Sequence, residues 1–576
     1  MIESELITLG ILFLFAVIGG VIAERFRQPA VIGLLLIGAI IGPNALNFVQ
    51  DQNMIEMMTE FGAILLLFVI GLEFVIPKLI KIGFKALLIG FLKIGIIFFM
   101  TYEFSLLLNF SKSIALIFGI LLSFSSTVVI IKILESKGLY HGRREMPLLI
   151  GVLLVEDIFA VLILTFLSGA NNASNIAAVF EKIAISITVL AIAYIIVNKL
   201  SRIIVSWFIK NSGDEAVTFI ALGSCVGFSY LAYFLGLSPS IGAFLAGSIV
   251  ASLPEARLFE NAIRPYALMF TSLFFISVGT MVDLFFFKTH MILILIFIAL
   301  IVISRFFAVG IISYLFANFK NDQIMFSSIA MITVSEFSLL IAQSAMKLNP
   351  GIDLVSLTAS IIFITALLMS FLVNHYTKAS SLLDNADNKK WASHPKSLSR
   401  YIQLLFGQID TESSNTNKFK KTFFKVLAYI IVSLFIIIGF KKLFFSQKFA
   451  VLPFYIFLYI AFIALMSFMI YKIYKMIGLM YKTLTIIIAD ISYSRNIKRS
   501  RYILNNLLIT ITLFIVAIFF PLIIMPFNIP YLNIIPFIFL IFVFIKLKNV
   551  TDVIESFQSE IDNFPKYKKI SEMQKA

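Results

Sequence analysis

Long apolar runs separated by short polar loops make up most of this chain. Runs long enough to cross about 30 Å of hydrocarbon, with some shorter ones allowed, predict thirteen membrane-spanning helices before residue 380. Their centres fall near residues 14, 36, 67, 97, 124, 157, 190, 225, 246, 274, 304, 335 and 364. The pattern therefore predicts an all-α polytopic membrane protein.

A polar stretch, KASSLLDNADNKKWASHPKSLSRYIQ, follows the thirteenth predicted span and indicates a domain boundary. Apolar runs then return, and about four further spans are predicted near residues 433, 460, 516 and 541. Four parts are predicted: a transmembrane domain over residues 1–378, a polar cytoplasmic linker over 379–422, an additional C-terminal transmembrane region over 423–550 and a charged cytoplasmic tail over 551–576.

Basic residues concentrate in alternate loops, such as ERFR, PKLIKIGFK and ESKGLYHGRRE after the first, third and fifth predicted spans. Because basic loops favour the cytoplasm, the N-terminus is predicted outside and the C-terminus inside a plasma membrane. Lys441, Lys442 and Lys448 would lie outside, against this trend. The first ten residues, MIESELITLG, lack the basic region of a signal peptide, so the first span is expected to be retained.

Composition narrows the class of protein further. Hydrophobic residues make up 60% of the chain, charged residues 13%, and the mean hydropathy is +1.02. A single cysteine excludes a disulfide framework within the chain, and the four histidines are too scattered to suggest a metal cluster (Cys225, His141, His290, His375, His394). No nucleophile spacing and no phosphate-binding loop is found, so we expect neither an enzyme nor a cofactor. The net charge of +15 is attributed to cytoplasmic loops and lipid contact rather than to nucleic acid.

Two segments of the predicted transmembrane domain resemble each other. The second predicted span contains IGLLLIGAIIG and the ninth contains IGAFLAGSIVA, offset by 209 residues. Offsets of 208 or 209 relate four pairs: Gly33 with Gly242, Gly38 with Gly247, Gly71 with Gly279 and Thr127 with Ser335. The two copies are seven spans apart, and because seven is an odd number of membrane crossings, the copies have opposite orientations in the membrane. The sequence therefore predicts inverted repeats, as in many secondary transporters.

Polar residues interrupt two predicted spans at positions that the repeat makes equivalent, SFSST at 123–127 and TVSEFS at 333–338. We interpret both as broken helices that cross near the middle of the membrane. Intact helices with ordinary packing hydroxyls are the alternative. The candidate residues in these segments are Ser123, Ser126, Thr127, Thr333, Ser335 and Glu336. Glu336 could cap a broken helix or meet a lysine.

The run GVLLVEDIFAVLIL places Glu156 and Asp157 side by side at mid-membrane, where one charge costs roughly 2.5–3.5 kcal/mol on insertion scales. Adjacent helical residues point about 100° apart, so the two carboxylates cannot share a partner equally. We expect Glu156 to meet Arg305, another charge deep in an apolar run, and Asp157 to face an ion cavity. A structural network of all three residues is the alternative. Counting 208 residues on, Thr365 is the predicted repeat counterpart of Asp157.

A carboxylate in an apolar cavity can bind either a proton or a cation, and this competition is the basis of exchange. If Arg305 keeps Glu156 ionised, only Asp157 alternates and exchange is one for one. If Glu156 is unpaired, a second proton moves and transport is electrogenic. Lys93 could face the bundle or extend to the interface.

The motifs QPAVIGLLLIGAIIGPNAL, SFSSTVVIIKIL, VLLVEDIFAVLIL, GLSPSIGAFLAGSIVAS, FFISVGTMVD and SEFSLLIA occur in this order. They resemble the monovalent cation:proton antiporters, in the branch of Kef-type potassium efflux systems and NapA-type sodium/proton exchangers. The resemblance implies thirteen spans in inverted repeats, a mobile core, a homodimer and elevator-like alternating access. It also implies that Asp157 binds the ion, Thr127 lies beside it and Arg305 is the basic residue of a neighbouring helix.

The sequence departs from this family in two ways. Its acidic pair is Glu-Asp, and no soluble nucleotide-binding domain follows the spans. The expected partners are a proton and a monovalent cation, Na⁺ or K⁺, with no other metal. A gated potassium pathway and a non-transporting sensor or assembly module on the same fold remain alternative functions.

Overall fold

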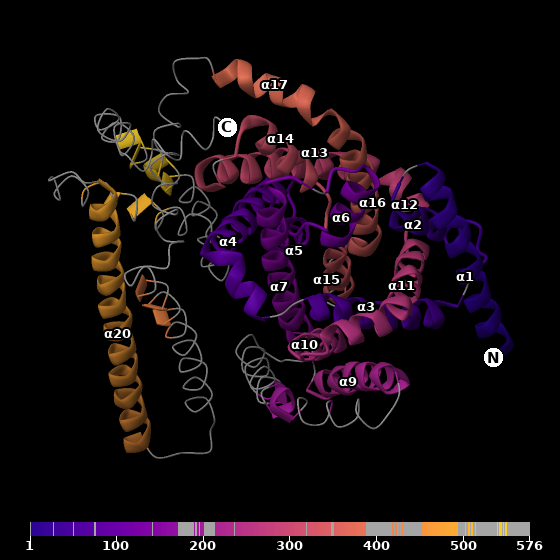
Figure 1. Cartoon of the computed structure of the whole chain (residues 1–576), viewed down its shortest axis with the longest axis horizontal. Coiled ribbons are helices and arrows are strands. Elements are labelled where there is room, and N and C mark those ends of the chain that lie inside the picture. Colours follow the sequence, from indigo (N-terminus) through magenta and orange to yellow (C-terminus); the bar gives the residue numbers. More distant parts are fainter. Residues whose placement is uncertain are drawn as a thin grey trace. The chain divides into compact units, whose positions relative to one another are not determined.

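The structure of the protein is a computed structural model (Figure 1). It describes residues 2–170 and 214–387 apart from short gaps, the helix Leu452–Ser492, and short stretches within 189–205, 418–429 and 502–549. Nearly all described residues lie in helices or the turns between them, and the described part contains no strand, only one isolated bridge. The prediction of an all-helical chain is confirmed for this part.

The helices follow the predicted spans closely. Their bounds are α1 (Ile2–Arg25), α2 (Ala30–Ile41), α3 (Gln52–Glu73), α4 (Ile76–Leu107), α5 (Lys112–Ser123), α6 (Thr127–Ser136), α7 (Met146–Ala170), α9 (Asp214–Phe234), α10 (Pro239–Ala251), α11 (Ala256–Thr280), α12 (Leu284–Thr289), α13 (Met291–Ile312), η1 (Ser313–Ala317), α14 (Asn321–Ala330), α15 (Glu336–Met346), α16 (Leu354–Leu372), η2 (Val373–His375), α17 (Tyr376–Asp387) and α20 (Leu452–Ser492). Among the described residues, eight helices are long and apolar enough to cross a membrane, and α2, α5 and α10 are shorter apolar helices. The predicted span near residue 190 falls largely outside the described residues.

Two compact units divide the chain, Met1–Phe306 with Ser327–His375, and Phe307–Phe326 with Tyr376–Ala576. In the second unit, α17 extends into the predicted polar linker, so the beginning of that segment is helical. The predicted span near residue 460 lies in α20, which has 41 residues and exceeds the roughly 20 that a bilayer requires. The predicted spans near 433 and 516 and the predicted tail lie outside the described residues.

Both predicted helix breaks are confirmed. The first break, residues 124–126, separates α5 from α6, and the second break, residues 331–335, separates α14 from α15. Ser125 and Val334 form an antiparallel bridge between the two breaks. On either side of it, Ser126 N donates to the Thr333 carbonyl at 3.3 Å, and Ser335 N donates to the Phe124 carbonyl at 3.1 Å. Backbone N–H and carbonyl groups that have no partner within their own helix at one break are therefore hydrogen-bonded to the backbone of the other break.

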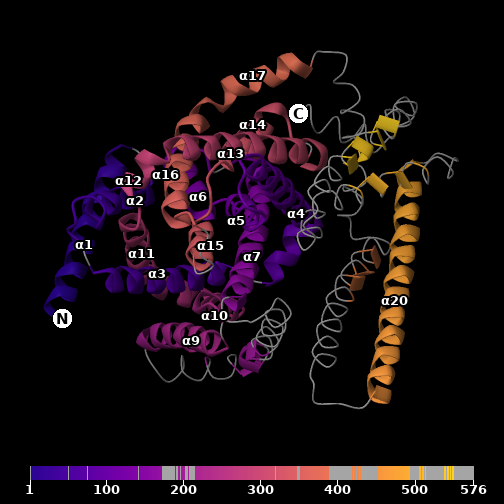
Figure 2. The same cartoon turned by 180° about the vertical axis from the view of Figure 1, so that it is seen from behind.

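Six helices, α1, α2, α3, α9, α10 and α11, pack against one another and are called the panel. Glycines bring their backbones close together. A Cβ on Gly38 of α2 would lie 2.2 Å from the Ile276 carbonyl oxygen of α11, and one on Gly71 of α3 would lie 2.3 Å from the Phe244 carbonyl oxygen of α10. Side chains at these positions would force the helices apart. Figure 2 shows α9, α10 and α3 lying side by side.

The bundle consists of α4, α5, α6, α7, α15 and α16, which contact one another more densely than they contact the panel. Described polar contacts between bundle and panel gather where α11 ends. Ser356 of α16 donates to the Met281 carbonyl at 3.3 Å and accepts from Asp283 N at 3.2 Å. Gln343 of α15 donates to the Met281 sulfur at 3.4 Å.

In the first unit, Met1–Phe306 with Ser327–His375, several contacts occur twice, and the residues of the second contact lie 208 or 209 positions from their counterparts in the first. Gly38 packs beside Gly279 and Gly71 packs beside Gly247, which are the same contact with the repeats interchanged. The backbone hydrogen bonds at the two breaks are interchanged in the same way. Such an exchange of partners is expected for two repeats related by a two-fold axis that passes between Ser125 and Val334.

Candidate functional site

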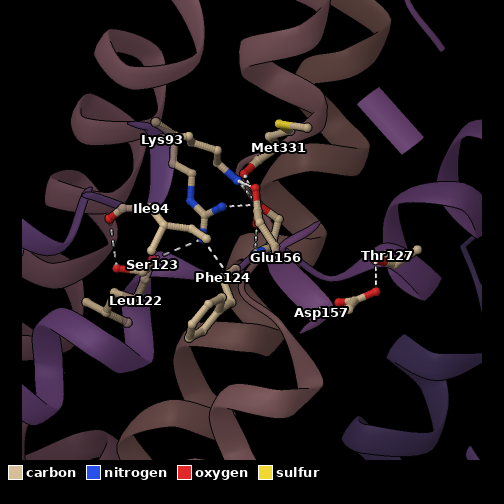
Figure 3. Close-up of polar contacts among 11 residues, drawn as sticks. Lys93, Ile94, Leu122, Ser123, Phe124, Thr127, Glu156, Asp157 and Met331 are labelled. Carbon is tan, nitrogen blue, oxygen red and sulfur yellow. Dashed lines mark hydrogen bonds and ion pairs between the residues drawn. The ribbon is translucent and has the colours of Figure 1, made fainter. Parts of the chain in front are cut away.

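The two adjacent carboxylates of α7 point in different directions, as the helical geometry requires (Figure 3). Glu156 points toward Lys93, and Asp157 points toward Thr127. Both side chains are buried, with exposed fractions of 0% and 2%. The pair therefore occupies two environments at one level of the bundle.

Glu156 forms an ion pair with Lys93 of α4, through Oε1. Its second oxygen, Oε2, accepts a hydrogen bond from Ser125 N at 2.8 Å. We expected Arg305 to be the ion-pair partner of Glu156, but the ion pair described for this carboxylate is with Lys93. Both carboxylate oxygens are used, one by a buried cation and the other by the first break.

Arg305 of α13 instead binds the end of α5. Its Nη2 donates to the carbonyls of Leu122 at 3.0 Å and Phe124 at 2.6 Å, and its Nη1 donates to Ser125 Oγ. The last carbonyls of a helix have no intrahelical donor and carry partial negative charge. The guanidinium, with five donors in a planar fork, satisfies several of these groups at once, which explains why it is not paired with Glu156.

Asp157 meets the beginning of α6. Thr127 is the first residue of that helix, and its Oγ1 donates to Asp157 Oδ2 at 2.8 Å. The preceding residue, Ser126, caps the helix by accepting from Val129 N at 3.1 Å. A helix N-terminus carries partial positive charge and favours an anion, so the break supplies both a hydroxyl and a dipole to the Asp157 carboxylate.

Glu336 is the first residue of α15 and is 3% exposed. Its Oε2 accepts from Ser126 Oγ at 2.5 Å. Of the two predicted possibilities, the partner found is a hydroxyl at the N-terminus of α6 and not a lysine. Glu336 therefore joins the two broken helices, one residue from the Thr127–Asp157 contact.

The remaining predicted residues lie at the breaks but differ in their contacts. Ser335 Oγ accepts from Phe337 N at 3.2 Å, at the start of α15. Thr333 contributes its carbonyl to Ser126, while its buried Oγ1 has no hydrogen-bond partner. Ser123 bonds back to the Gly119 carbonyl of its own helix at 2.6 Å and is not brought to the carboxylates.

Sequence reasoning missed the roles of Lys93 and Ser125. Lys93 was a lone lysine in the apolar run LLIGFLKIGIIFF, a signal equal to that of Arg305. Ser125 Oγ accepts from both cations, with Lys93 Nζ at 2.5 Å, and lies 3.4 Å from the Met331 carbonyl to which it can donate. These contacts join α4, α13 and the two breaks.

The predicted repeat counterpart of Asp157 is also corrected. Val334 N donates to Thr365 Oγ1 at 3.3 Å, as Ser125 N donates to Glu156. Because Ser125 and Val334 are counterparts at an offset of 209, Thr365 corresponds to Glu156. Among the described residues, no group of three or more histidine, cysteine, aspartate or glutamate side chains is placed to hold a metal ion.

Comparison with known proteins adds to this geometry. Residues 11–379 match the family model "Sodium/hydrogen exchanger, transmembrane". A Na(+)/H(+) antiporter from Enterococcus hirae is 30% identical over 353 residues, which are 59% of this chain and 90% of that protein. K(+) efflux antiporter 5 from Arabidopsis thaliana is 28% identical over 304 residues, which are 51% of this chain. The matched region is about half of the plant protein, 53% of its length.

A solved structure, that of the sodium proton antiporter MjNhaP1 from Methanocaldococcus jannaschii, aligns with a TM-score of 0.49 and 16% sequence identity, over 65% of this chain and 98% of that one. The family match spans more than half of the chain and includes both breaks and both carboxylates of α7. The chain belongs to the sodium/hydrogen exchanger family of cation:proton antiporters.

Proposed function

We propose that this protein is a secondary transporter that exchanges Na⁺ or K⁺ for protons, with Asp157 binding the two in turn. The observation that carries the proposal is the separation of the two carboxylates of α7. Glu156 has both oxygens engaged, whereas Asp157 lies at the N-terminus of α6 beside the Thr127 hydroxyl. Asp157 is the carboxylate whose surroundings suit an exchangeable ion.

The chemistry of this site favours competition between proton and cation. A buried carboxylate must be neutralised, either by a proton or by a bound cation. Oxygen ligands from hydroxyls and backbone carbonyls complete the coordination of alkali cations, and the breaks supply both kinds. If the site can move across the membrane only when Asp157 is neutralised by a proton or a cation, one cation is exchanged for one proton.

The proposed fold is the thirteen-span inverted-repeat arrangement, with the bundle moving against the panel in an elevator-like manner. The paired contacts related by offsets of 208 or 209 residues support the repeat. Close glycine contacts favour a rigid panel, while sparse contacts between panel and bundle favour relative movement. The four C-terminal spans, the plasma-membrane location with the N-terminus outside, and the homodimer belong to the same proposal.

Related proteins include antiporters named for potassium and for sodium, so relatedness leaves the cation open. The test is reconstitution of the full chain in proteoliposomes with an imposed pH gradient. Addition of Li⁺, Na⁺, K⁺ or Rb⁺ should dissipate the gradient for Na⁺ or K⁺. A cation flux that leaves the pH gradient unchanged would indicate a passive pathway, and the absence of any flux from correctly inserted protein would refute transport.

A further inference from the structure

Three buried hydroxyl groups in α14 and the second break have no hydrogen-bond partner among the described residues, and we call them the hydroxyl cluster (Ser327, Ser328, Thr333). Their side chains are 0%, 1% and 1% exposed. Many other buried hydroxyls bond back to their own helix, as Ser360 Oγ does to the Ser356 carbonyl at 2.7 Å. Buried polar groups are nearly always hydrogen-bonded, so the hydroxyl cluster requires a partner from outside the protein chain.

The other repeat offers a direct comparison, because α5 and α14 begin at positions 209 residues apart, Lys112 and Asn321. At this offset the counterparts of the hydroxyl cluster are Phe118, Gly119 and Phe124. None of these three residues has a polar side chain. The hydroxyls are therefore present in one repeat only.

Apolar side chains fill the space around the counterparts in α5. The Phe118 ring has its centroid 4.7 Å from that of Phe297 and 5.1 Å from that of Phe110. A Cβ added to Gly119 would lie 2.9 Å from the Phe98 ring. Such packing offers water neither room nor hydrogen-bond partners, whereas buried hydroxyls are typical ligands of internal water. The two halves of the crossing therefore differ in their ability to hold water.

We propose that the hydroxyl cluster binds water molecules, which hydrate the breaks from the α14 side and give the exchanged proton a path to solvent, while the α5 side stays dry. The inference rests on the proposed function, which places proton exchange at Asp157. The Thr333 carbonyl accepts from Ser126 N at 3.3 Å, and the next residue, Thr127, bonds to Asp157. Under the proposed orientation, α14 lies in the cytoplasmic half of the membrane, so the path opens to the cytoplasm.

The first experiment locates the water. Hydroxyl radicals formed from water by short X-ray pulses oxidise a buried methionine when water is bound beside it. Met331 lies in the second break and is 1% exposed, and its counterpart 209 residues earlier is Leu122, which is 2% exposed. The conservative substitution Leu122→Met therefore places the same reporter on the α5 side.

In the full-length Leu122→Met protein, Met331 should be oxidised and the introduced methionine should not. Met58 of α3 is 7% exposed and lies next to Thr59, whose hydroxyl bonds to the Ile55 carbonyl of its own helix. It should also stay unmodified, which shows that the fold is intact. Equal oxidation on the α14 and α5 sides, or no oxidation of Met331, would overturn the inference.

The second experiment tests the path itself. Thr333→Val removes the hydroxyl and keeps the branched shape, whereas Thr333→Ser retains the hydroxyl. Loss of one hydrogen bond lowers the occupancy of a bound water by up to about tenfold. Oxidation of Met331 and the maximal rate of exchange in proteoliposomes should therefore both fall severalfold in Thr333→Val and recover in Thr333→Ser, with the apparent KM for the cation unchanged.

A raised KM with an unchanged maximal rate in Thr333→Val would overturn the inference, because Thr333 would then bind the cation and not water. Unchanged oxidation of Met331 in this variant would overturn it as well. Absence of exchange in the wild type would instead reject the proposed function, while oxidation of Met331 would still decide whether the α14 side is hydrated. The two failures are therefore distinguishable.

Discussion

Ser125 and Val334 lie opposite each other in one antiparallel bridge, although 209 residues separate them in the chain. That separation equals the offset between the repeated segments. Each residue donates its backbone N–H to a side chain at the matching position of its own repeat, Glu156 in one case and Thr365 in the other. The repeats thus share a scaffold, while the ionisable group is present in one copy only.

This asymmetry bears on how the site is built. Thr365, at the position that corresponds to Glu156, accepts from the equivalent backbone donor without placing a charge at that position. Of these two counterparts, only Glu156 is charged, and Lys93 forms an ion pair with it.

Replacement of Asp157 by asparagine should abolish exchange. Asparagine retains the size of the side chain and a hydrogen-bond acceptor for Thr127, but it cannot become an anion. Cation-driven pH changes in proteoliposomes should fall to the level of empty liposomes. Asp283→Asn is the matched control, because Asp283 caps α12 and asparagine caps equally well. Retained exchange in a well-folded Asp157→Asn protein would contradict the proposed mechanism.

Arg305→Met should destabilise the protein by about 1–3 kcal/mol, because the buried Leu122 carbonyl loses its charged donor. Thermal unfolding in detergent measures this loss. Lys132→Met is the control, since Lys132 pairs with Glu135 at the surface and such pairs contribute at most about 1 kcal/mol. Equal stability of the two variants would show that Arg305 does not support the first break.

Gly38→Ala and Gly71→Ala should each destabilise the panel by about 1–3 kcal/mol, because the added methyl group would meet a backbone carbonyl. Gly20→Ala in α1 has open space around its Cβ and should leave stability within about 1 kcal/mol. Thermal unfolding of the three variants provides the comparison. If all three behave alike, close backbone contact does not limit these positions.

A covalent link between Met281 and Gln343 should stop exchange, because it would join panel and bundle at the end where they touch. The test uses cysteines at both positions in a Cys225→Ala background, with a short reducible cross-linker, and exchange should return on reduction. Cysteines at Phe15 of α1 and Phe48 of the loop that follows α2, whose rings stack with centroids 5.9 Å apart, provide the control. Undiminished exchange in fully cross-linked Met281/Gln343 protein would exclude movement of bundle against panel at this contact.

The hydrophobic pattern was sufficient to predict the helical class, most of the spans and both breaks. Membrane helices must satisfy their backbone internally, so an apolar run and a polar interruption have few structural solutions. The repeat offset could be read from glycines because close backbone contact accepts little else. The resemblance to the antiporters implied that Thr127 lies beside Asp157, and in the structure their side chains are joined by a hydrogen bond of 2.8 Å.

The partner of Glu156 could be decided only by the tertiary structure. Lys93 and Arg305 were equally unusual as charges in apolar runs, and periodicity does not specify which distant helix a side chain faces. The fold brings α4 against α7, and it directs the guanidinium of Arg305 to the unpaired carbonyls of α5. Sequence determined that buried charges need partners, because isolated ions are costly in hydrocarbon; packing determined which partners they have.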